Sequence, residues 1–144
     1  MTQNWIYIDP VHPEDWFGFV YVITNKVTGR IYVGKKVFWN NLKKKLTKTE
    51  LAEQTGPGRK PTHKRVTKES NWLTYWGSNK ELLEDVKELG QDNFERKILK
   101  LCKSKKELTY YELHYQCKEE VLLTNSYNDN ILGKFYRRDL LSED

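Results

Sequence analysis

The sequence predicts an α+β domain built on a three-stranded, mostly antiparallel sheet flanked by helices. Two β-branched and aromatic runs that meet at a glycine turn, and a third alternating run at residues 94–101, predict the sheet. Serine and glutamate three residues apart precede apolar periodic segments at 78–90 and 105–121, which predicts two capped helices. The chain has 144 residues, so we expect a single domain over 1–144.

The first 36 residues are predicted to form an N-terminal cover and a β-hairpin. Residues 1–17 are rich in aromatic side chains, and Pro10 and Pro13 exclude a helix there, so we expect an extended N-terminal cover over the core. Residues 18–36 predict a β-hairpin, with Gly29 free to take a positive φ in the turn.

The register of this hairpin decides whether two tyrosines share a face. Pairing of Thr24 with Ile31 would place Tyr21 opposite Gly34 and make Tyr21 and Tyr32 diagonal neighbours on one face. A slip by one residue would put them on opposite faces. Two phenols beside a glycine and lysines would form a polar pocket floor. The alternative is an amphipathic hairpin whose tyrosines pack on the core and keep their hydroxyls in water.

Positive charge is concentrated in one segment of the chain. The net charge is +5, but residues 35–68 hold eleven Lys/Arg against two acids, so the remainder is −4. Residues 37–70 are predicted to form a long basic insertion with a short helix near 48–54, because Gly56-Pro57-Gly58 and Pro61 favour loop structure. Such a segment indicates contact with nucleic acid, and the alternative is a solvated, flexible loop.

One carboxylate interrupts the apolar face of the helix predicted at 105–121. Leu108, Tyr111 and Tyr115 lie on the same helical face as Glu112. A carboxylate in an apolar stripe must be paired, protonated or bound to a cation. A salt bridge to a buried lysine, or a stripe edge that reaches water, would satisfy the first condition without any function.

Several short motifs together resemble the GIY-YIG nuclease family. Phe19-Val20-Tyr21 and Tyr32-Val33-Gly34 resemble its paired signature, with Phe19 where the family has glycine and the two tyrosines 11 residues apart. The segment Tyr75-Trp76-Gly77-Ser78, the pair Asn93-Phe94 and the triplet Ser126-Tyr127-Asn128 resemble later family segments. The resemblance covers about residues 18–131 and suggests a small stand-alone member of the phage or mobile-element type.

The resemblance implies a metal-dependent DNA endonuclease that hydrolyses phosphodiester bonds. Glu112 would bind a single Mg²⁺ or Mn²⁺, and Asn128 would help to fix the metal-bound phosphate or the glutamate. Tyr21 is favoured as the general base with Tyr32 in its hydrogen-bond network, although the two roles could be reversed. Lys35 is the cation available to lower the pKa of that phenol.

The chain departs from the family where most members carry an arginine followed by a histidine or tyrosine. Arg65 is our first candidate for the role of clamping the phosphate, Lys68 is the next, and Tyr75 would replace the histidine or tyrosine. The predicted catalytic residues are Tyr21, Tyr32, Lys35, Arg65, Glu112 and Asn128. The predicted DNA-binding residues are Lys36, Lys43, Lys44, Lys45, Lys64, Lys68, Tyr75 and Ser78.

The expected partner is double-stranded DNA, and a homodimer is compatible with the sequence. No apolar run approaches the ~20 residues of a membrane span, and the N-terminus lacks a signal-peptide pattern, so we expect a cytoplasmic protein of a bacterium or a phage-infected cell. Residues 132–144 would form a C-terminal tail. The alternatives are a catalytically inactive nucleic-acid-binding module of the same fold and, as a third hypothesis, a protein-interaction domain.

Overall fold

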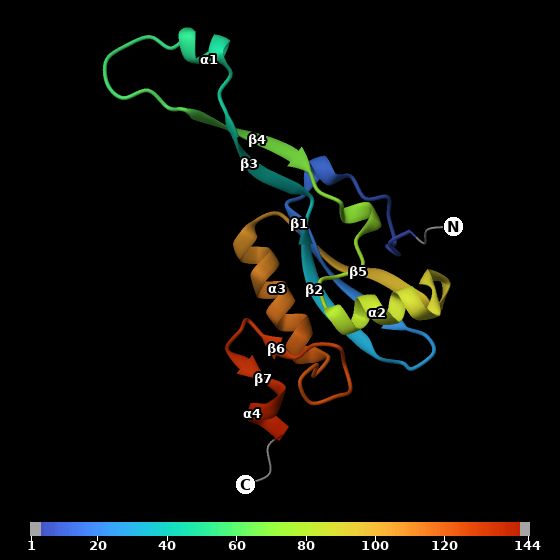
Figure 1. Ribbon diagram of the computed structural model, residues 1–144. Coiled ribbons are helices and arrows are strands. Elements are labelled where there is room, and N and C mark those ends of the chain that lie inside the picture. The colour runs from blue at the N-terminus through green and yellow to red at the C-terminus, as the bar shows by residue number, and fades with distance from the viewer. Residues whose placement is uncertain (1–3, 142–144) are drawn as a thin grey trace. The chain divides into compact units, whose positions relative to one another are not determined.

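The computed structural model describes residues 4–141, which divide into two compact units (Figure 1). The first unit is formed by Met1–Phe38 and Asn71–Asp144, and the second by Trp39–Ser70. Residues 1–3 of the predicted N-terminal cover and residues 142–144 of the predicted tail lie outside the described residues.

The first unit contains the predicted three-stranded sheet. Its strands are β1 (Gly18–Asn25), β2 (Ile31–Val37) and β5 (Phe94–Cys102), in the order β2-β1-β5. Both pairings are antiparallel, so the predicted sheet is confirmed, and β2 lies at one edge. A register shift between Val20 and Tyr21 in the pairing with β5 interrupts the regular ladder next to Tyr21.

The hairpin has the first of the two registers that the sequence left open. Thr24 pairs with Ile31 and Tyr21 with Gly34, so Tyr21 and Tyr32 lie on the same face of the sheet. Their ring centroids are 6.2 Å apart. Gly29 takes a φ of 79° in the turn, where a side chain would be strained.

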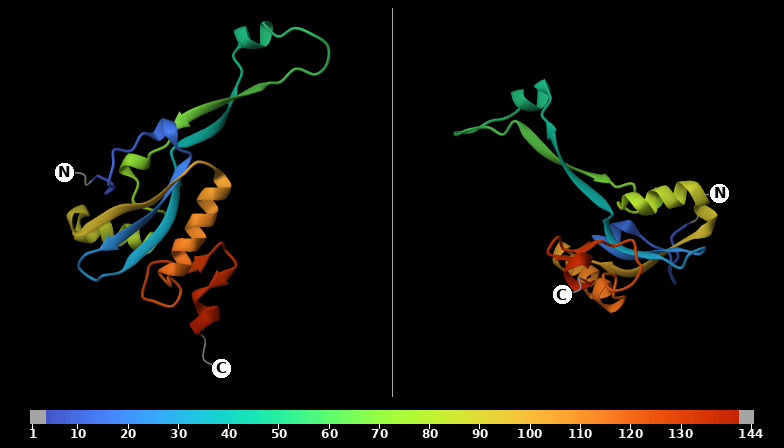
Figure 2. Two further views of the ribbon diagram at one scale, coloured as in Figure 1. Left: turned by 180° about the vertical axis from the view of Figure 1, so that it is seen from behind. Right: turned by 60° about the horizontal axis from the view of Figure 1, so that its bottom comes forward.

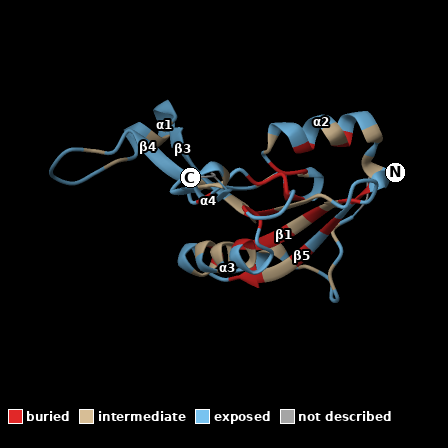
Figure 3. Ribbon diagram, turned by 90° about the horizontal axis from the view of Figure 1, so that it is seen from below, coloured by how far each residue is buried: buried red, intermediate tan, exposed pale blue. Residues whose placement is uncertain are grey.

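Helices cover both faces of this sheet (Figure 3). On one face, α3 (Lys105–Lys118) packs through Leu108 on Val20 and Val33, together with residues that follow the helix. The opposite face, toward α2 (Lys80–Leu89), is aromatic, and Phe19 contacts the rings of Trp5, Phe38 and Trp72 there. The alternation of β1 side chains thus divides the core into an aliphatic half and an aromatic half.

An extended segment before β1 adds to the aromatic half. The backbone amide of Ile6 donates to the Arg96 carbonyl at 2.8 Å, and Ile6 forms an isolated parallel bridge with Lys97 on β5. Trp5 stacks edge-on against Phe19 and Tyr21. A short 3-10 helix (Pro13–Asp15) follows, and two others lie at Trp72–Thr74 and Gln91–Asn93.

The start of α2 differs from the prediction. The N-cap is Asn79, whose side chain accepts a hydrogen bond from the Leu82 amide at 2.9 Å, so the predicted capping box of Ser78 with Glu81 is wrong. Glu81 instead forms an ion pair with Arg30. The predicted helix end is confirmed, since Gly90 closes the helix with a φ of 89°.

After α3 the chain returns along the first unit in short elements. Ser104 caps α3 by accepting from the Glu107 amide at 3.1 Å. The helix ends at Lys118, three residues before the predicted end. It is followed by β6 (Asn130–Ile131), β7 (Phe135–Tyr136) and α4 (Arg137–Leu141).

The second unit is a hairpin of two strands, where the sequence predicted a long loop. The strands are β3 (Trp39–Lys45) and β4 (His63–Glu69), and the short helix α1 (Lys48–Ala52) lies in their connection (Figure 2). The prediction of irregular structure for these strands is therefore wrong. It failed because the glycines and prolines that favour loop structure are confined to the connection between the strands.

Candidate active site

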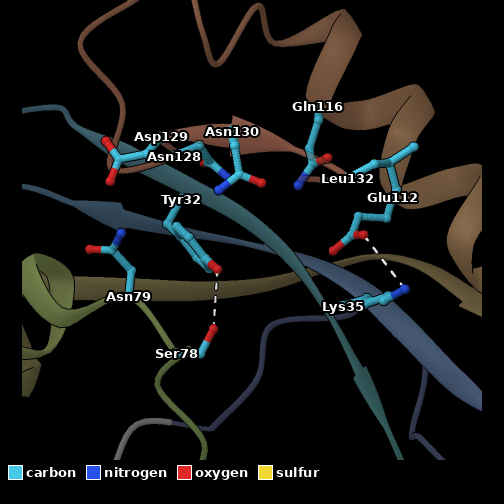
Figure 4. A pocket seen from close by; sticks show the side chains of 10 residues that line it. All are labelled: Tyr32, Lys35, Ser78, Asn79, Glu112, Gln116, Asn128, Asp129, Asn130 and Leu132. Carbon is cyan, nitrogen blue, oxygen red and sulfur yellow. Dashed lines mark hydrogen bonds and ion pairs between the residues drawn. The ribbon is translucent and has the colours of Figure 1, made fainter. Parts of the chain in front are cut away.

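A pocket of about 410 Å³ lies beside the outer edge of β2 in the first unit (Figure 4). Its lining is mostly polar and comes from β2, the N-terminus of α2, α3 and the segment that follows α3. The lining residues are Tyr32, Lys35, Ser78, Asn79, Glu112, Gln116, Asn128, Asp129, Asn130 and Leu132. Five of the residues predicted from the sequence therefore meet here: Tyr32, Lys35, Ser78, Glu112 and Asn128.

The position of β2 at the sheet edge explains how this set assembles. Successive side chains of a strand point to opposite faces, so Tyr32 faces the aromatic half and Lys35 faces α3. A pocket beside an edge strand can be lined by side chains from both faces of the sheet. Tyr32 Oη lies 3.4 Å from Ser78 Oγ, and Lys35 Nζ lies 3.8 Å from Glu112 Oε1.

Glu112 and Asp129 are the two acids that line the pocket, and the charge of Glu112 is incompletely compensated. Its side chain is 14% exposed, and burial raises its pKa, an effect that Lys35 opposes without cancelling it. At 3.8 Å the Lys35 ammonium is too distant for a good hydrogen bond, and it also donates to Thr109 Oγ1 at 3.3 Å. A carboxylate in this state has capacity to bind a further cation.

The two tyrosines differ in their access to the pocket. Tyr32 lines the pocket, whereas Tyr21 is 1% exposed. Burial and the phenols of Tyr32 and Tyr75 raise the pKa of Tyr21 well above its ordinary value. Burial also raises the pKa of Tyr32, although the hydrogen bond with Ser78 partly lowers it. Tyr32 is thus the phenol that can reach a molecule in the pocket.

Gly34 permits the close approach of the two phenols. A Cβ atom at position 34 would lie 2.6 Å from Tyr21 Oη and 3.0 Å from Tyr32 Cε2. Any larger side chain would displace both rings, so the glycine of the second triplet is required by the packing of the tyrosine pair.

Two side-chain amides close the free edge of β2 next to the pocket. Asn128 is buried and makes both bonds to Val33: its Oδ1 accepts from the Val33 amide at 3.0 Å and its Nδ2 donates to the Val33 carbonyl at 2.9 Å. Gln116 Nε2 donates to the same carbonyl at 3.1 Å. The Asn128 amide is therefore used in anchoring the segment after α3 to β2.

Gln116 is a pocket residue that sequence reasoning missed. It lies one helical turn after Glu112, so it shares the pocket face of α3. Its Oε1 is buried and has no hydrogen-bond partner among the residues that the structure describes. Because its Nε2 is fixed by the Val33 carbonyl, the orientation of this amide is set, and Oε1 is a buried acceptor that the described residues leave unsatisfied.

Two further residues hold the pocket wall and were also missed. Asn79 caps α2 and donates through Nδ2 to the Tyr127 carbonyl at 2.9 Å, which links α2 to the segment after α3. The Arg137 guanidinium donates to the carbonyls of Val121 at 2.8 Å and Asn128 at 2.7 Å, and to the Ser126 hydroxyl at 3.2 Å. The spacing of one helical turn from Glu112 could have identified Gln116, whereas nothing in the sequence pattern could have identified Arg137.

The remaining predicted residues lie outside the pocket lining. Lys36 Nζ lies 4.0 Å from the Tyr75 ring centroid, and the Tyr75 ring contacts Tyr21 with centroids 6.0 Å apart. Burial lowers the pKa of Lys36. The other predicted residues belong to the second unit: Lys43, Lys44, Lys45, Lys64, Arg65 and Lys68.

The donor set limits how a metal could be held. Within residues 4–141 no group of three or more His, Cys, Asp or Glu side chains could hold a metal ion. Glu112 would be its carboxylate ligand, with the Gln116 Oε1 atom as a nearby acceptor for a coordinated water. One carboxylate that leaves most coordination sites to water and phosphate matches the preference of Mg²⁺, so the residues present fit this ion.

The sequence of the chain matches a known protein family. A family model described as "Putative endonuclease segE, GIY-YIG domain" matches residues 5–139. The chain therefore belongs to the GIY-YIG nuclease family. No curated protein and no solved structure matches the chain. No helix within the described part of the chain is long and apolar enough to cross a membrane.

Proposed function

We propose that this chain is a metal-dependent endonuclease that hydrolyses phosphodiester bonds in double-stranded DNA. The observation that carries the proposal is the pocket at the edge of β2, where a phenol, an ammonium group and an incompletely compensated carboxylate line one cavity. Membership of the GIY-YIG family supports the reaction class. The lining of the pocket is polar, and its two carboxylates against one lysine mean that an anionic substrate group would bind there together with a cation.

In this proposal Glu112 holds Mg²⁺ or Mn²⁺ beside the scissile phosphate. When bound, the ion would neutralise phosphate charge and stabilise the leaving oxygen. Glu112 must be ionised to bind it, and its raised pKa means that acid conditions would favour release. The Gln116 Oε1 atom would accept a hydrogen bond from water in the pocket.

Tyr32 is the group that we propose to accept the proton of the attacking water. It lines the pocket, whereas Tyr21 lies in the buried layer below and supports the Tyr32 ring at 6.2 Å. The sequence favoured Tyr21 for this role, and the difference in exposure leads us to assign the two in reverse. A phenol with a raised pKa is a strong base once it is deprotonated, so activity should increase with pH.

Lys35 is the cation of the pocket. We propose that it interacts both with Glu112 and with a phosphate group of the substrate. It lies on the α3 side of β2, where its ammonium group reaches Glu112 and can reach a phosphate oxygen in the same cavity. Arg65, with Lys68 next, remains our candidate for clamping a DNA phosphate, and both residues belong to the second unit. The DNA backbone would be contacted by the other basic residues of 36–68 and by Tyr75 and Ser78.

A catalytically inactive nucleic-acid-binding module is the second candidate function. Lys35 is the one cation, and no arginine is found, among the described residues that line the pocket. A binding module would keep its affinity in chelator and would lose it with rising salt. Cleavage assays therefore separate the two candidates.

The test is cleavage of supercoiled plasmid by wild type and by Glu112→Gln, in Mg²⁺, in Mn²⁺ and in chelator. We expect wild type to nick or linearise the plasmid only with metal, and the variant to lose at least about 10²-fold in rate. Glu119→Gln is the matched control, because Glu119 is exposed and follows the same helix. DNA binding without cleavage in either metal would favour the binding module.

A further inference from the structure

The hairpin of the second unit carries its cations symmetrically. We call β3 and β4, residues 39–45 and 63–69, the basic ribbon. Each strand contributes three Lys/Arg residues. In the observed register, each face also carries three: Lys43, Lys45 and Arg65 on one, and Lys44, Lys64 and Lys68 on the other.

The register places like charges directly opposite each other. Lys43 pairs with Arg65 and Lys44 with Lys64, an arrangement that destabilises an isolated ladder. Lys64 is paired with Glu50. Within the described residues, no ion pair is formed by the other five cations: Lys43, Lys44, Lys45, Arg65 and Lys68. Concentrated cations without counter-charges on the protein indicate a polyanionic partner.

The ribbon offers little to any partner that binds through apolar contacts. Its one apolar rung is Leu42 with Val66, and Leu42 is 47% exposed. Trp39, at the start of β3, is the aromatic side chain of the two strands. A surface that binds single-stranded nucleic acid needs successive aromatic platforms for the bases, and these strands do not supply them.

We infer that the basic ribbon lies in the major groove of B-form DNA, an inference that rests on the proposed action on double-stranded DNA. Two strands about 4.8 Å apart, with side chains projecting from both faces, match a groove about 12 Å wide and exceed a minor groove of about 6 Å. Because β3 and β4 carry equal numbers of cations, each edge can face one of the two phosphate backbones. The major groove of A-form RNA is too narrow for such a ribbon.

The connection between the strands is built to keep the ribbon in shape. The Leu46 amide donates to the Thr62 carbonyl at 2.9 Å, which extends the ladder beyond the strands. Glu50 completes a capping box with Thr47 on α1 and also pairs with Lys64 at 2.6 Å. These contacts are local to the second unit, and of the six ribbon cations they use Lys64 alone, which leaves the other five for DNA.

The first experiment measures affinity by fluorescence anisotropy with a 20-base-pair duplex in chelator, using the full chain with Glu112→Gln. We compare it with a further triple variant, Lys43→Gln, Lys44→Gln and Lys45→Gln, which removes ribbon cations that have no proposed catalytic role. We expect at least tenfold weaker binding at 0.1 M salt, and a slope of log affinity against log salt that is smaller by about 2 to 3. The matched control removes three exposed lysines of the first unit: Lys26, Lys87 and Lys97.

The second experiment assigns the groove. A duplex with bulky substituents at C5 of its pyrimidines blocks the major groove, and netropsin blocks the minor groove of an AT-rich duplex. We expect the C5 substituents to weaken binding at least tenfold and netropsin to have little effect. The reverse result, or equal affinity for single-stranded DNA or duplex RNA, would overturn the inference.

Failure of this inference is distinguishable from failure of the proposed function. If wild type cuts plasmid but the ribbon variant binds as tightly as its parent, the ribbon does not hold the DNA and the nuclease assignment stands. If groove binding depends on the ribbon while wild type cuts nothing in either metal, the inference stands and the proposed function fails. Circular dichroism of each variant verifies that it is folded.

Discussion

Each of the two units contains a glutamate–lysine pair, and the two pairs differ in geometry and exposure. In the second unit, Lys64 Nζ lies 2.6 Å from Glu50 Oε2, and the Glu50 side chain is 30% exposed. In the first unit, Lys35 Nζ lies 3.8 Å from Glu112 Oε1, and the Glu112 side chain is 14% exposed. The more exposed glutamate therefore has the shorter distance to its lysine.

The same chemical pair has opposite effects in the two places. The hydrogen bond from Lys64, followed by the bond from the Thr47 amide, lowers the pKa of Glu50 to about 2. Burial raises the pKa of Glu112, because the distant Lys35 does not offset the loss of water. One carboxylate is satisfied by the protein, and the other is held in a pocket with part of its charge unbalanced.

The two units carry unpaired charges of opposite sign. The first unit keeps an under-compensated anion in a cavity, where a metal ion could bind. The second unit uses its own glutamate to order α1 and leaves five cations exposed, where a polyanion could bind. Each unit, taken separately, has unpaired charge that the phosphates of DNA, with a metal counter-ion at the pocket, would satisfy.

The largest effect should come from one hydroxyl group of the first unit. Tyr32→Phe should lower the cleavage rate by about 10²–10⁴-fold, because it removes the proposed proton acceptor and leaves the ring in place. The wild-type rate should rise about tenfold per pH unit from pH 7 to 9, since burial keeps the pKa of Tyr32 above its ordinary value of about 10. Plasmid cleavage over this pH range provides the measurement.

Tyr110→Phe is the matched control for this change, because Tyr110 lies on α3 and is 62% exposed. It should leave the rate and its pH dependence unaltered. If Tyr32→Phe cuts as fast as wild type and Tyr21→Phe loses activity, then Tyr21 is the base and our assignment is reversed. Loss of DNA binding by Tyr32→Phe would instead place its hydroxyl in substrate recognition.

An intermediate effect on stability should follow from Asn128→Ala. The substitution leaves the Val33 amide without its partner, so the free energy of unfolding should fall by about 1–3 kcal/mol. Urea denaturation measures this change. Asn125→Ala is the matched control, since Asn125 is exposed and uses its backbone carbonyl to bond Arg30. A cleavage loss above 10²-fold with unaltered stability would mean that Asn128 contacts the substrate, as the family resemblance implied.

The sheet and its tyrosine pair were predictable because local signals agreed with each other. The glycine turn predicted the hairpin, and the observed pairing of Thr24 with Ile31 decided between the two open registers and placed Tyr21 and Tyr32 on one face. Glu112 was conspicuous because a carboxylate on an apolar helical face must be paired, protonated or bound to a cation. In each case the deciding information lies within one element or one hairpin.

The missed features depend on partners that are remote in the sequence or on patterns without apolar contrast. Gln116 bonds the Val33 carbonyl 83 residues away, and Glu81 pairs with Arg30 51 residues away instead of capping α2. The strands of the basic ribbon were missed because nearly all of their side chains are exposed. Without a buried face, a strand shows no alternation of apolar and polar residues.

The smallest effect, and the most direct test of the comparison itself, is the titration of the two carboxylates. NMR of the side-chain carboxyl carbons should give Glu50 a midpoint near pH 2 and Glu112 a midpoint above its ordinary value. In Lys64→Gln the Glu50 midpoint should rise, because its largest stabilising partner is gone. In Lys35→Gln the Glu112 midpoint should rise further, because Lys35 is the group that opposes the effect of burial on the pKa of Glu112.

The same shifts set the pH dependence of each unit. The pKa of Glu50 is depressed, so its contribution to the order of the ribbon is present above about pH 4.5 and is lost as the pH falls toward 2. The pKa of Glu112 is raised, so ionisation of this group opposes folding at neutral pH unless a cation is bound. Adding Mg²⁺ should therefore lower the midpoint of Glu112 and leave that of Glu50 unchanged. Equal responses of the two carboxylates would show that the pocket has no greater capacity for a cation than the protein surface.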